Sequence, residues 1–301
     1  MTRRIVEVGL HGARVSTARR QIVIQRAEEV QPRELRVPAE DLGALILDNQ
    51  QCVTTVPALA RIADQGGIVV ICGDKHLPVS VLLPVSCHTT TVVRIREQIE
   101  APRPLVKRLW KQIVQAKIRA QARNLPPESA VREKLLALAR GVRSGDAGNH
   151  EAQAARAYWP HWAADLPGFK RDTDGEGVNA LLNYGYAIVR AATARALVAA
   201  GFCAAIGLHH RNRGNPFCLA DDMMEPLRPL VDHRVRLIAD NGDAEIGPET
   251  KSRLLGLLLD PVLHDGQLLP LMDTVQRTAA SLARCLSKEQ DQLEFPQGVE
   301  E

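Results

Sequence analysis

The stretch that decides the fold is LVKRLWKQIVQAKIRAQARN, which runs from Leu105 to Asn124 of the 301-residue chain. It contains neither glycine nor proline, the residues that most often interrupt a helix, so it predicts one long helix. Pro126 and Pro127 follow and end it, because proline inside a helix removes a backbone hydrogen bond. The sequence before this stretch has a different pattern from the sequence after it.

Beyond this stretch the chain has the pattern of helices almost to its end. Segments without helix breakers alternate with polar loops such as residues 141–148, and Gly201 ends the longest segment. The helices expected here are Glu128–Arg143, Glu151–Ala163, Val178–Ala200, Leu219–Asp232, Pro248–Leu259 and Leu269–Leu286. Helical character begins at about Thr91. We therefore predict an all-helical domain over residues 89–290, followed by a loose polar tail over residues 291–301.

Residues 1–88 show the shorter periodicity of β-strands. Glu34–Val37 alternates as a half-buried strand does, whereas Ile68–Cys72 is continuously apolar, as expected of a strand covered on both faces. Further strands are expected at residues 5–8, 21–25, 45–47 and 79–83, with one helix at Val56–Ala63. The fold class is thus α+β with two domains, a small β-rich N-terminal domain over residues 1–88 and the all-helical domain after it.

Composition narrows the class of protein. Hydrophobic residues make up 45% of the chain and charged residues 24%, which is typical of a globular protein and argues against global disorder. No apolar run approaches the roughly 18 residues of a transmembrane helix, so no membrane span is expected. The six cysteines form no C-x-x-C pair, which argues against a zinc ribbon and favours reduced thiols in a cytoplasmic protein.

Basic residues are concentrated between Arg94 and Arg123. This stretch holds nine Lys or Arg residues against two Glu, a local excess larger than the net charge of +3 of the whole chain. Lys107 and Lys111 are one helical turn apart, as are Arg108 and Lys111, so they are expected on one face of the helix. Such a stripe can follow the phosphates of a nucleic acid, and the plain alternative is a solvated helix face.

The segment richest in chemical groups is GLHHRNRGNPFCLADDMMEPLRP, residues 207–229. His209 and His210 precede a loop of Arg, Asn and Gly, and a helix then begins with Asp221, Asp222 and Glu225. Histidine with carboxylates is a ligand set for a divalent metal, and the predominance of oxygen favours Mg²⁺ or Mn²⁺ over zinc. The ordinary alternative is that carboxylates in a first helical turn serve as caps, which explains Glu225 less well because it lies deeper in the helix.

Glu151 is the second candidate for a metal or an ion pair. It shares a helical stripe with Ala155 and Tyr158, and a carboxylate on such a stripe must be exposed, paired or bound to a cation. Arg156 and Arg195 are available as partners. The three tyrosines and two of the three tryptophans lie between residues 158 and 186, which indicates one region of space where aromatic rings pack or stack on a nucleic acid.

Several of these segments together resemble a known family. The matching segments are RLWKQIV at 108–114, Glu151–Trp159, NALLNYGY at 179–186, NPF at 215–217 after His210, and DMMEPLRPLVD at 222–232. They are similar to the CRISPR-associated adaptation integrase, Cas protein number one, in the branch found with type II systems. That family inserts new spacer DNA into the CRISPR array. The resemblance extends over nearly the whole chain.

The resemblance implies a site and a set of partners. Its metal ligands, which are also the catalytic residues, fall on Glu151, His210 and Glu225. Secondary candidates for the site are Asp222, His209, Tyr184 and Asn183, and candidates for DNA contact are Lys107, Arg108, Lys111, Arg211, Arg213 and Arg228. It also implies a homodimer whose N-terminal domain dimerises, two dimers bridged by the small ferredoxin-like Cas protein number two, and double-stranded DNA as substrate. Whether the RNA-guided effector nuclease joins the complex is left open.

The reaction implied is spacer acquisition, a phosphodiester transesterification. A free 3′-hydroxyl of prespacer DNA attacks a phosphodiester at the leader end of the repeat, with Mg²⁺ or Mn²⁺ neutralising charge on the phosphoryl oxygens. Two other hypotheses fit the same residues. One is a stand-alone metal-dependent nuclease that acts on branched DNA in repair, and the other is a non-catalytic DNA-binding dimer. The presence of all three ligand types argues against the non-catalytic dimer.

Overall fold

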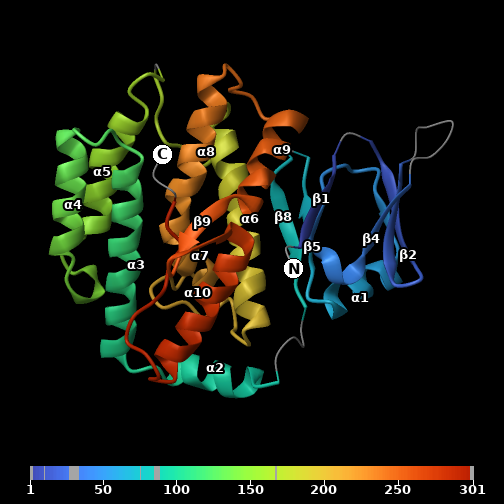
Figure 1. Cartoon of the computed structure of the whole chain (residues 1–301), viewed down its shortest axis with the longest axis horizontal. Coiled ribbons are helices and arrows are strands. Elements are labelled where there is room, and N and C mark those ends of the chain that lie inside the picture. The colour runs from blue at the N-terminus through green and yellow to red at the C-terminus, as the bar shows by residue number, and fades with distance from the viewer. Residues whose placement is uncertain are drawn as a thin grey trace.

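The computed structural model describes residues 3–9, 11–26, 34–74, 76–84, 89–166 and 168–298. A β part formed by the first strands lies beside a larger helical part, as Figure 1 shows. The boundary predicted at residues 88 and 89 falls beside residues 85–88, which are outside the described residues, as is Cys87. The other five cysteines are free thiols. Within the described ranges, every helix is too short or too polar to span a bilayer.

The β part consists of two four-stranded sheets. In the first, the order is β1 (Arg4–Val8), β5 (Leu42–Leu47), β7 (Ile68–Cys72) and β8 (Pro78–Leu82), and only β8 is antiparallel to its neighbour. The second has the order β4 (Glu34–Pro38), β3 (Gln21–Arg26), β2 (Ala13–Ala18) and β6 (Val53–Thr54). Helix α1 (Val56–Asp64) packs with both sheets, contacting β2 and β7.

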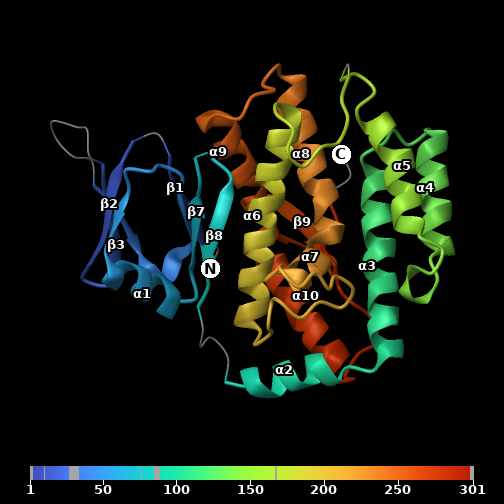
Figure 2. The ribbon, with the colours of Figure 1, turned by 180° about the vertical axis from the view of Figure 1, so that it is seen from behind.

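The first sheet is shared between the β part and the helical part. Successive residues of its central strands belong to different hydrophobic cores. Leu45 and Val69 face the core of the β part, whereas Ile46 and Val70 belong to the core of the helical part. Both faces of these strands are therefore buried, which explains their continuously apolar sequence. Since β8 also packs against α6, the sheet and the helices form one continuous interface (Figure 2).

The helical part is built around α6 (Val178–Ala199), which runs through its middle and is buried along most of its length. The helices α7 (Cys218–Met224), α8 (Arg228–Asp240), α9 (Pro248–Gly256) and α10 (Leu271–Leu286) pack on it. On the far side from the sheets, α3 (Arg103–Arg123), α4 (Ala130–Gly141) and α5 (His150–Trp162) pack together (Figure 1), and α2 (Thr91–Glu100) precedes them. The prediction of α+β with a helical C-terminal part is confirmed.

The helical part is not purely helical, which corrects the prediction for residues 89–290. Strands β9 (Pro261–His264) and β10 (Gln267–Pro270) form a hairpin where a helix was expected to start at Leu269. Its turn is Asp265-Gly266, and both residues have positive φ, 49° and 72°. Asp-Gly between apolar residues is a strong signal for a two-residue hairpin turn, which the helical interpretation overlooked. Strand β2 also went unpredicted, because its turn to β3 uses Arg19 and Arg20 rather than glycine.

The described end of the chain is held against the helices, although a loose tail was expected from residue 291. The Leu293 amide donates to Gln112 Oε1 at 2.8 Å, and Gln112 Nε2 donates to the Asp291 carbonyl at 3.0 Å. Gln297 pairs with Leu263 of β9. Polar composition alone does not reveal such contacts, because the partners on α3 lie far away in the sequence.

Candidate catalytic site

Four elements bring the candidate residues together. Lys117 comes from the middle of α3, and Glu151 from the first turn of α5. His210 lies on the loop between α6 and α7. Glu225 opens the short 3-10 helix Glu225–Leu227 that follows α7. The three predicted ligands therefore sit on separate elements that all pack against or beside α3.

Asp222 organises the His210 loop. Its fully buried carboxylate accepts hydrogen bonds from the backbone amides of residues 208, 209 and 210, at 2.6, 2.9 and 3.1 Å. It also accepts from Nδ1 of His210 at 2.6 Å. Because a carboxylate only accepts, Nδ1 carries the proton and Nε2 is left with its lone pair for another partner. A side chain at Gly207 would collide with this arrangement, since its Cβ would lie 2.5 Å from the His210 carbonyl.

These contacts separate the roles of the neighbouring polar residues. Both oxygens of Asp222 are used within the loop, so Asp222 orients His210 rather than facing a cation beside it. His209 stacks flat on Trp110. Asp221 is paired with Arg190 at 2.7 Å. The hydrogen bond that His210 donates to Asp222 raises the pKa of His210, against the opposing effect of partial burial.

Glu151 and Glu225 converge on the ammonium group of Lys117. Lys117 Nζ lies 2.6 Å from Glu151 Oε1 and also contacts Glu225 Oε2. The other oxygen of Glu225 is paired with Arg228 Nε at 2.9 Å. Two carboxylates thus face two cations in a site where Glu225 is 4% exposed. The Lys117 ammonium is therefore the partner of the buried Oε2 of Glu225.

Lys117 and Glu225 remain charged despite their burial. Burial alone would lower the pKa of Lys117, but Glu225 and Glu151 outweigh it and raise that pKa. Burial alone would raise the pKa of Glu225, but Lys117 and Arg228 outweigh it and lower that pKa. Opposite charges at hydrogen-bonding distance favour the ionised form of each partner. The contacts of Glu225 with Lys117 and Arg228 are therefore ion pairs between charged groups.

Glu151 is positioned by the cap of its helix. Asp146 Oδ1 accepts from the His150 amide at 2.9 Å, and Oδ2 accepts from the Glu151 amide at 3.1 Å. The cap satisfies backbone donors of the first turn of α5 that would otherwise lack partners. Gly145 precedes it with a φ of 71°, and a Cβ there would lie 3.1 Å from Lys107. Glycine thus allows this loop to approach α3 closely.

A second polar network supports Arg228 from behind. The buried Asp232 accepts hydrogen bonds from the hydroxyls of Tyr158, at 3.0 Å, and Tyr186. Arg228 lies over the Tyr186 ring, 4.8 Å from its centroid. Asn124 of α3 donates to the Tyr158 hydroxyl at 2.9 Å. Burial raises the pKa of Asp232 to about 6, although both tyrosines and Arg228 oppose this.

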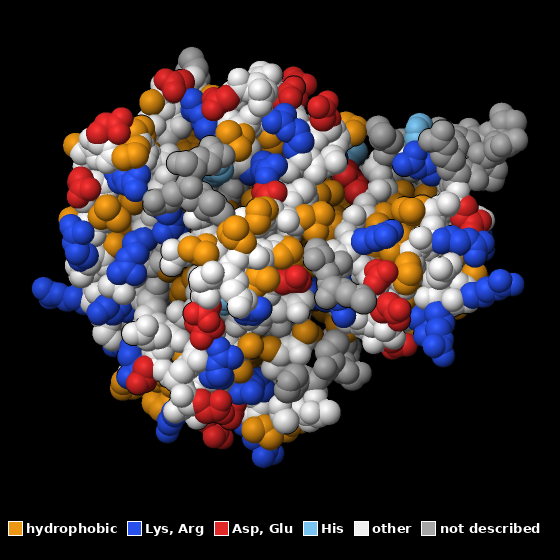
Figure 3. All heavy atoms as spheres, viewed as in Figure 1, with side chains coloured by type: hydrophobic (Ala, Val, Ile, Leu, Met, Phe, Trp, Pro, Cys, Tyr) orange, Lys and Arg blue, Asp and Glu red, His pale blue; other side chains and the backbone are white. Residues whose placement is uncertain are grey.

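A basic groove passes His210. It is lined by Trp110, His209 and His210 together with Arg103, Lys107, Arg211 and Arg213. A separate hollow on α3 is lined by Arg108, Lys111, Arg119 and Arg123 and by the end of the chain, where Asp291 pairs with Arg108 at 2.9 Å. Lys107 and Lys111, one turn apart on α3 as predicted, therefore line different hollows. Figure 3 shows Lys and Arg side chains gathered on the side formed by α3, α4 and α5.

Three predicted residues lie away from the groove. Arg228 is paired with Glu225 inside the ion-pair cluster, rather than lining the groove as a DNA contact would. Asn183 accepts from Arg171 at 2.6 Å and donates to the Thr173 carbonyl, so it anchors a loop. Tyr184 is fully buried, and its hydroxyl donates to Glu7 of β1 at 3.3 Å. The three residues lie outside the lining of this groove, and their predicted roles remain predictions.

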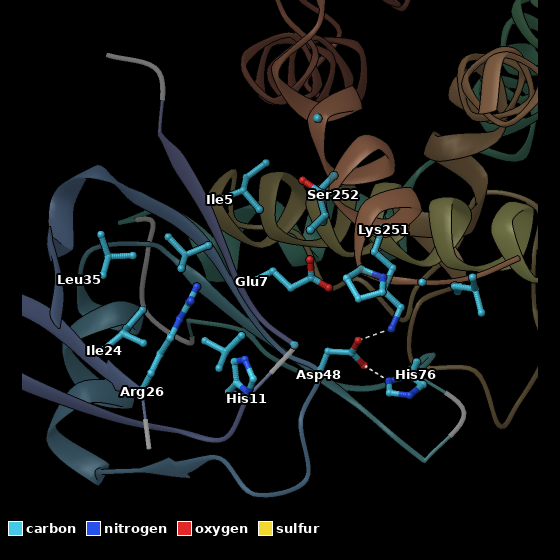
Figure 4. A pocket seen from close by; sticks show the side chains of 18 of the residues that line it. Ile5, Glu7, His11, Ile24, Arg26, Leu35, Asp48, His76, Lys251 and Ser252 are labelled. Atoms are coloured by element: carbon cyan, nitrogen blue, oxygen red, sulfur yellow. Dashed lines mark hydrogen bonds and ion pairs between the residues drawn. The ribbon is translucent and has the colours of Figure 1, made fainter. Parts of the chain in front are cut away.

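Tyr184 belongs to the junction between the two parts of the molecule. Figure 4 shows the hollow there, with Glu7 and Asp48 from the first sheet and Lys251 from α9 on facing sides. Asp48 is paired with both Lys251 and His76. This hollow shares no lining residue with the groove at His210. Its buried ion pair ties the sheet to the helices.

The most important residue that sequence reasoning undervalued is Lys117. It was counted only as one of nine cations in a basic stretch. Yet it lies on the face of α3 that also buries Ile113, Val114 and Ile118. A lysine on an apolar helical face needs a buried anionic partner, and that was the available signal. Asp146, which accepts from the first two amides of α5, lies four residues ahead of that helix, whereas the ordinary N-cap position is Asn149.

The donor set suits a hard divalent cation. Two carboxylates face one point, and the His210 side chain belongs to the same cluster of interacting groups. Among the described residues, no three His, Cys, Asp or Glu side chains stand in the arrangement of metal ligands. The ammonium of Lys117 occupies the point that both carboxylates face. The carboxylates are therefore spaced around an ammonium group and not around a metal ion.

Known structures share this fold. A casposase bound to integration product superposes with a TM-score of 0.82, at 19% identity, over 98% of this chain and 93% of that one. A chain of a Cas6-RT-Cas1–Cas2 complex superposes with a TM-score of 0.77, at 18% identity, over 100% of this chain and 36% of that one. The class that this fold defines is that of Cas1 proteins and casposases.

Sequence comparison identifies the family. Residues 7–246 match the family of the CRISPR associated protein Cas1. The chain is 36% identical over 292 residues to the CRISPR-associated endonuclease Cas1 of Neisseria meningitidis serogroup C (strain 8013), a match that covers 95% of this chain and 94% of that protein. The chain belongs to the Cas1 family of endonucleases and integrases, as its sequence motifs predicted.

Proposed function

We propose that this protein is a metal-dependent DNA integrase that inserts prespacer DNA into the CRISPR array. The observation that carries the proposal is the convergence of Glu151 and Glu225 on one cation, beside a histidine whose Nε2 is free. A basic groove passes the same histidine. This combination suits attack on a phosphodiester whose flanking phosphates are held by Lys and Arg. Family membership makes the CRISPR array the natural target.

In this proposal Glu151, His210 and Glu225 hold Mg²⁺ or Mn²⁺. The ion, when bound, supplies positive charge that stabilises the phosphoryl oxygens as the 3′-hydroxyl of the prespacer attacks. Asp222 keeps the His210 imidazole in the tautomer that presents Nε2. Arg228 fixes Glu225 through its second oxygen. The protein's own part in the reaction is thus to orient three donors before the DNA arrives.

The groove residues would position the DNA. Lys107, Arg211 and Arg213 line the groove with His210, and the loop carrying the two arginines is exposed. Each cation that contacts a phosphate holds the backbone without reading its sequence. A strand held there would pass His210. This geometry favours attack on a DNA backbone over attack on a small phosphate ester.

We further propose that the chain acts as a homodimer with the small partner Cas2. A structural neighbour is a complex that contains Cas1 and Cas2. The β part, where dimerisation is expected, exposes Val53, Val56 and Val79 at 57%, 75% and 70%. Exposed apolar side chains on one part of a protein favour an interface there. Double-stranded DNA, as prespacer and as leader-repeat, completes the proposed assembly, and the effector nuclease is a further candidate partner.

A strand-transfer assay tests the proposal. A supercoiled plasmid bearing the array is incubated with labelled prespacer, with and without Cas2, and with Mg²⁺, Mn²⁺ or EDTA. We expect the label to join the plasmid at the leader end only when a metal is present. Glu151→Ala and His210→Ala should abolish joining while DNA binding is largely kept. Cleavage without joining would favour a stand-alone nuclease, and joining by both variants would refute the assigned site.

A further inference from the structure

Lys117 stands where a metal ion held by Glu151 and Glu225 would have to lie. Its Nζ is 2.6 Å from Glu151 Oε1 and is also in contact with Glu225 Oε2. A magnesium ion binds carboxylate oxygens at about 2.0–2.1 Å, so the ammonium and the ion cannot both occupy the point between these oxygens. Lys117 is held there by two ion pairs, and its side chain is 13% exposed. Loading of the site must therefore displace it.

We propose that Lys117 is a built-in competitor of the divalent ion, and that its transfer from the carboxylates to a DNA phosphate makes metal binding depend on DNA. The inference rests on the proposed function in one respect, namely that Glu151 and Glu225 hold the metal. The inference adds that the site binds the divalent ion weakly when DNA is absent. The DNA then serves as the partner that completes the metal site as well as the substrate.

The balance of charge supports this dependence. Lys117 and Arg228 neutralise Glu151 and Glu225, so the four groups together carry no net charge. A divalent ion added to them leaves two uncompensated positive charges in a largely buried cluster, which is costly. A DNA phosphate supplies negative charge at that place. The displaced ammonium also needs a new anionic partner, and a phosphate is the partner that the substrate brings.

Lys117 is the cation that can be displaced, and Arg228 is the one that stays. Arg228 contacts the opposite oxygen of Glu225 and lies over the Tyr186 ring, which is itself bonded to Asp232. Lys117 has only the two carboxylates as partners of its ammonium in the described structure. Its four-carbon stem is flexible, and the neighbouring Glu151 side chain is 27% exposed. The cluster is thus open on the Glu151 side.

The inference predicts a reciprocal coupling between the two ligands. If DNA strengthens binding of the metal by some factor, the metal must strengthen binding of DNA by the same factor. Couplings of this kind are typically about 5-fold to 150-fold. Phosphate oxygens that bind the metal directly would contribute to the coupling in any variant. The part of the coupling that is due to Lys117 is therefore the difference in the DNA effect on metal affinity between the wild type and a variant without the ammonium.

The experiment measures Mn²⁺ affinity by electron paramagnetic resonance, with and without a short DNA duplex. The full chain is compared with Lys117→Met, which keeps the length of the side chain and removes its charge. We expect Lys117→Met without DNA to bind Mn²⁺ about tenfold more tightly than the wild type, within the usual range of coupling. The duplex should tighten Mn²⁺ binding markedly in the wild type and distinctly less in the variant.

Lys111→Met is the matched control. It removes the same charge from the same helix, but Lys111 lines the separate hollow beside the end of the chain. Its Mn²⁺ affinity without DNA should equal that of the wild type. An equal gain of affinity in both variants would mean that general charge on α3 is responsible, and it would overturn the specific role of Lys117.

Removal of the Lys117 ammonium leaves two carboxylates close together, so unfolding is measured in parallel. We expect Lys117→Met to melt at lower temperature than the wild type in EDTA and to be stabilised more by Mn²⁺, because the ion replaces the ammonium. Lys117→Gln, which keeps a hydrogen-bond donor, serves as a second variant. If neither variant folds even with Mn²⁺, the ion does not substitute for Lys117 and the inference is wrong.

Failure of the inference and failure of the proposed function give different results. If the wild type binds no Mn²⁺ even with DNA, or if Glu225→Gln leaves Mn²⁺ binding unchanged, the metal site itself is refuted. If Mn²⁺ binding requires Glu225 but the effect of the duplex is the same in the wild type and in Lys117→Met, only the competition by Lys117 is refuted.

Discussion

The imidazole of His209 lies flat on the buried indole of Trp110, with ring centroids 4.1 Å apart and planes 2° apart. The neighbouring His210 meets the edge of the same indole at 5.9 Å and 87°. One tryptophan of α3 therefore fixes two consecutive histidines at right angles. The stack holds His209, while the His210 ring is hydrogen-bonded to Asp222.

We expect His209→Ala to slow strand transfer more than it destabilises the fold. Removal of the stacked ring should cost about 1 kcal/mol of unfolding free energy, the usual contribution of an aromatic pair. If His210 then loses its orientation, strand transfer should fall by about tenfold, which corresponds to about 1.4 kcal/mol. His209→Phe keeps a flat ring over Trp110 and should retain most of the activity. Equal loss in both variants would show that His209 acts through its nitrogens.

The cap of α5 offers a test of how Glu151 is placed. Asp146→Ala should cost about 1–2 kcal/mol of unfolding free energy, because two backbone amides lose their acceptor. Ser129→Ala removes the cap of α4, where the Ser129 hydroxyl accepts from the Val131 amide, and should cost about 1 kcal/mol. Only Asp146→Ala should weaken Mn²⁺ binding and slow strand transfer. A similar effect of both on activity would indicate a general loss of stability.

Removal of charge in the two hollows of α3 should have different effects on DNA binding. Changing Lys107, Arg211 and Arg213 to Ala should lower the salt dependence of duplex binding by about 0.9 for each phosphate that is no longer neutralised. Changing Arg108 and Lys111 should have a smaller effect, since Arg108 is already paired with Asp291 and both line the other hollow. Measurement of duplex binding over a range of salt concentrations compares the two sets of variants. A larger effect of the Arg108 and Lys111 changes would place the DNA in the hollow beside the end of the chain.

Asp232 should make stability depend on pH. Burial raises the pKa of Asp232 from 3.8 to about 6, so the folded protein binds a proton more tightly than the unfolded chain. A carboxyl of this kind stabilises the fold at low pH, and the contribution is lost as the pH rises through the folded pKa. The shift of about 2 units corresponds to about 3 kcal/mol.

Comparison with Asp232→Asn isolates this contribution, because asparagine does not titrate. The unfolding free energy of the wild type relative to Asp232→Asn should fall by about 3 kcal/mol between about pH 4 and about pH 7. Urea unfolding at several pH values measures it. A difference that stays constant would show that Asp232 is ionised in the folded protein throughout that range.

Most secondary structure was predictable because its signals are local. The alternating and continuous apolar runs of the sheets and the unbroken stretches of the helices follow from side chains a few residues apart. The strands that were missed adjoin turns that those patterns did not reveal. The hairpin at Asp265-Gly266 interrupts a helical pattern, and the turn at Arg19-Arg20 has positive φ without glycine.

The sequence alone determined which chemical groups are available. It contains histidine and carboxylates in the pattern of a divalent-metal site, and its family motifs singled out Glu151, His210 and Glu225. It left Asp222 and Glu225 as competing candidates, because two carboxylates three residues apart look alike on a helix. It also treated Lys117 as one cation among several.

The tertiary structure decided what each of these groups faces. Asp222 is used by the loop of residues 208–210, whereas Glu225 turns toward Lys117. Lys117 meets Glu151 only because α3 and α5, 34 residues apart in the chain at these positions, pack side by side. A residue's identity sets its charge and its donors, but the direction of its side chain across an interface depends on the packing of whole elements. That is why the candidate ligands could be named from the sequence and the lysine between them could not.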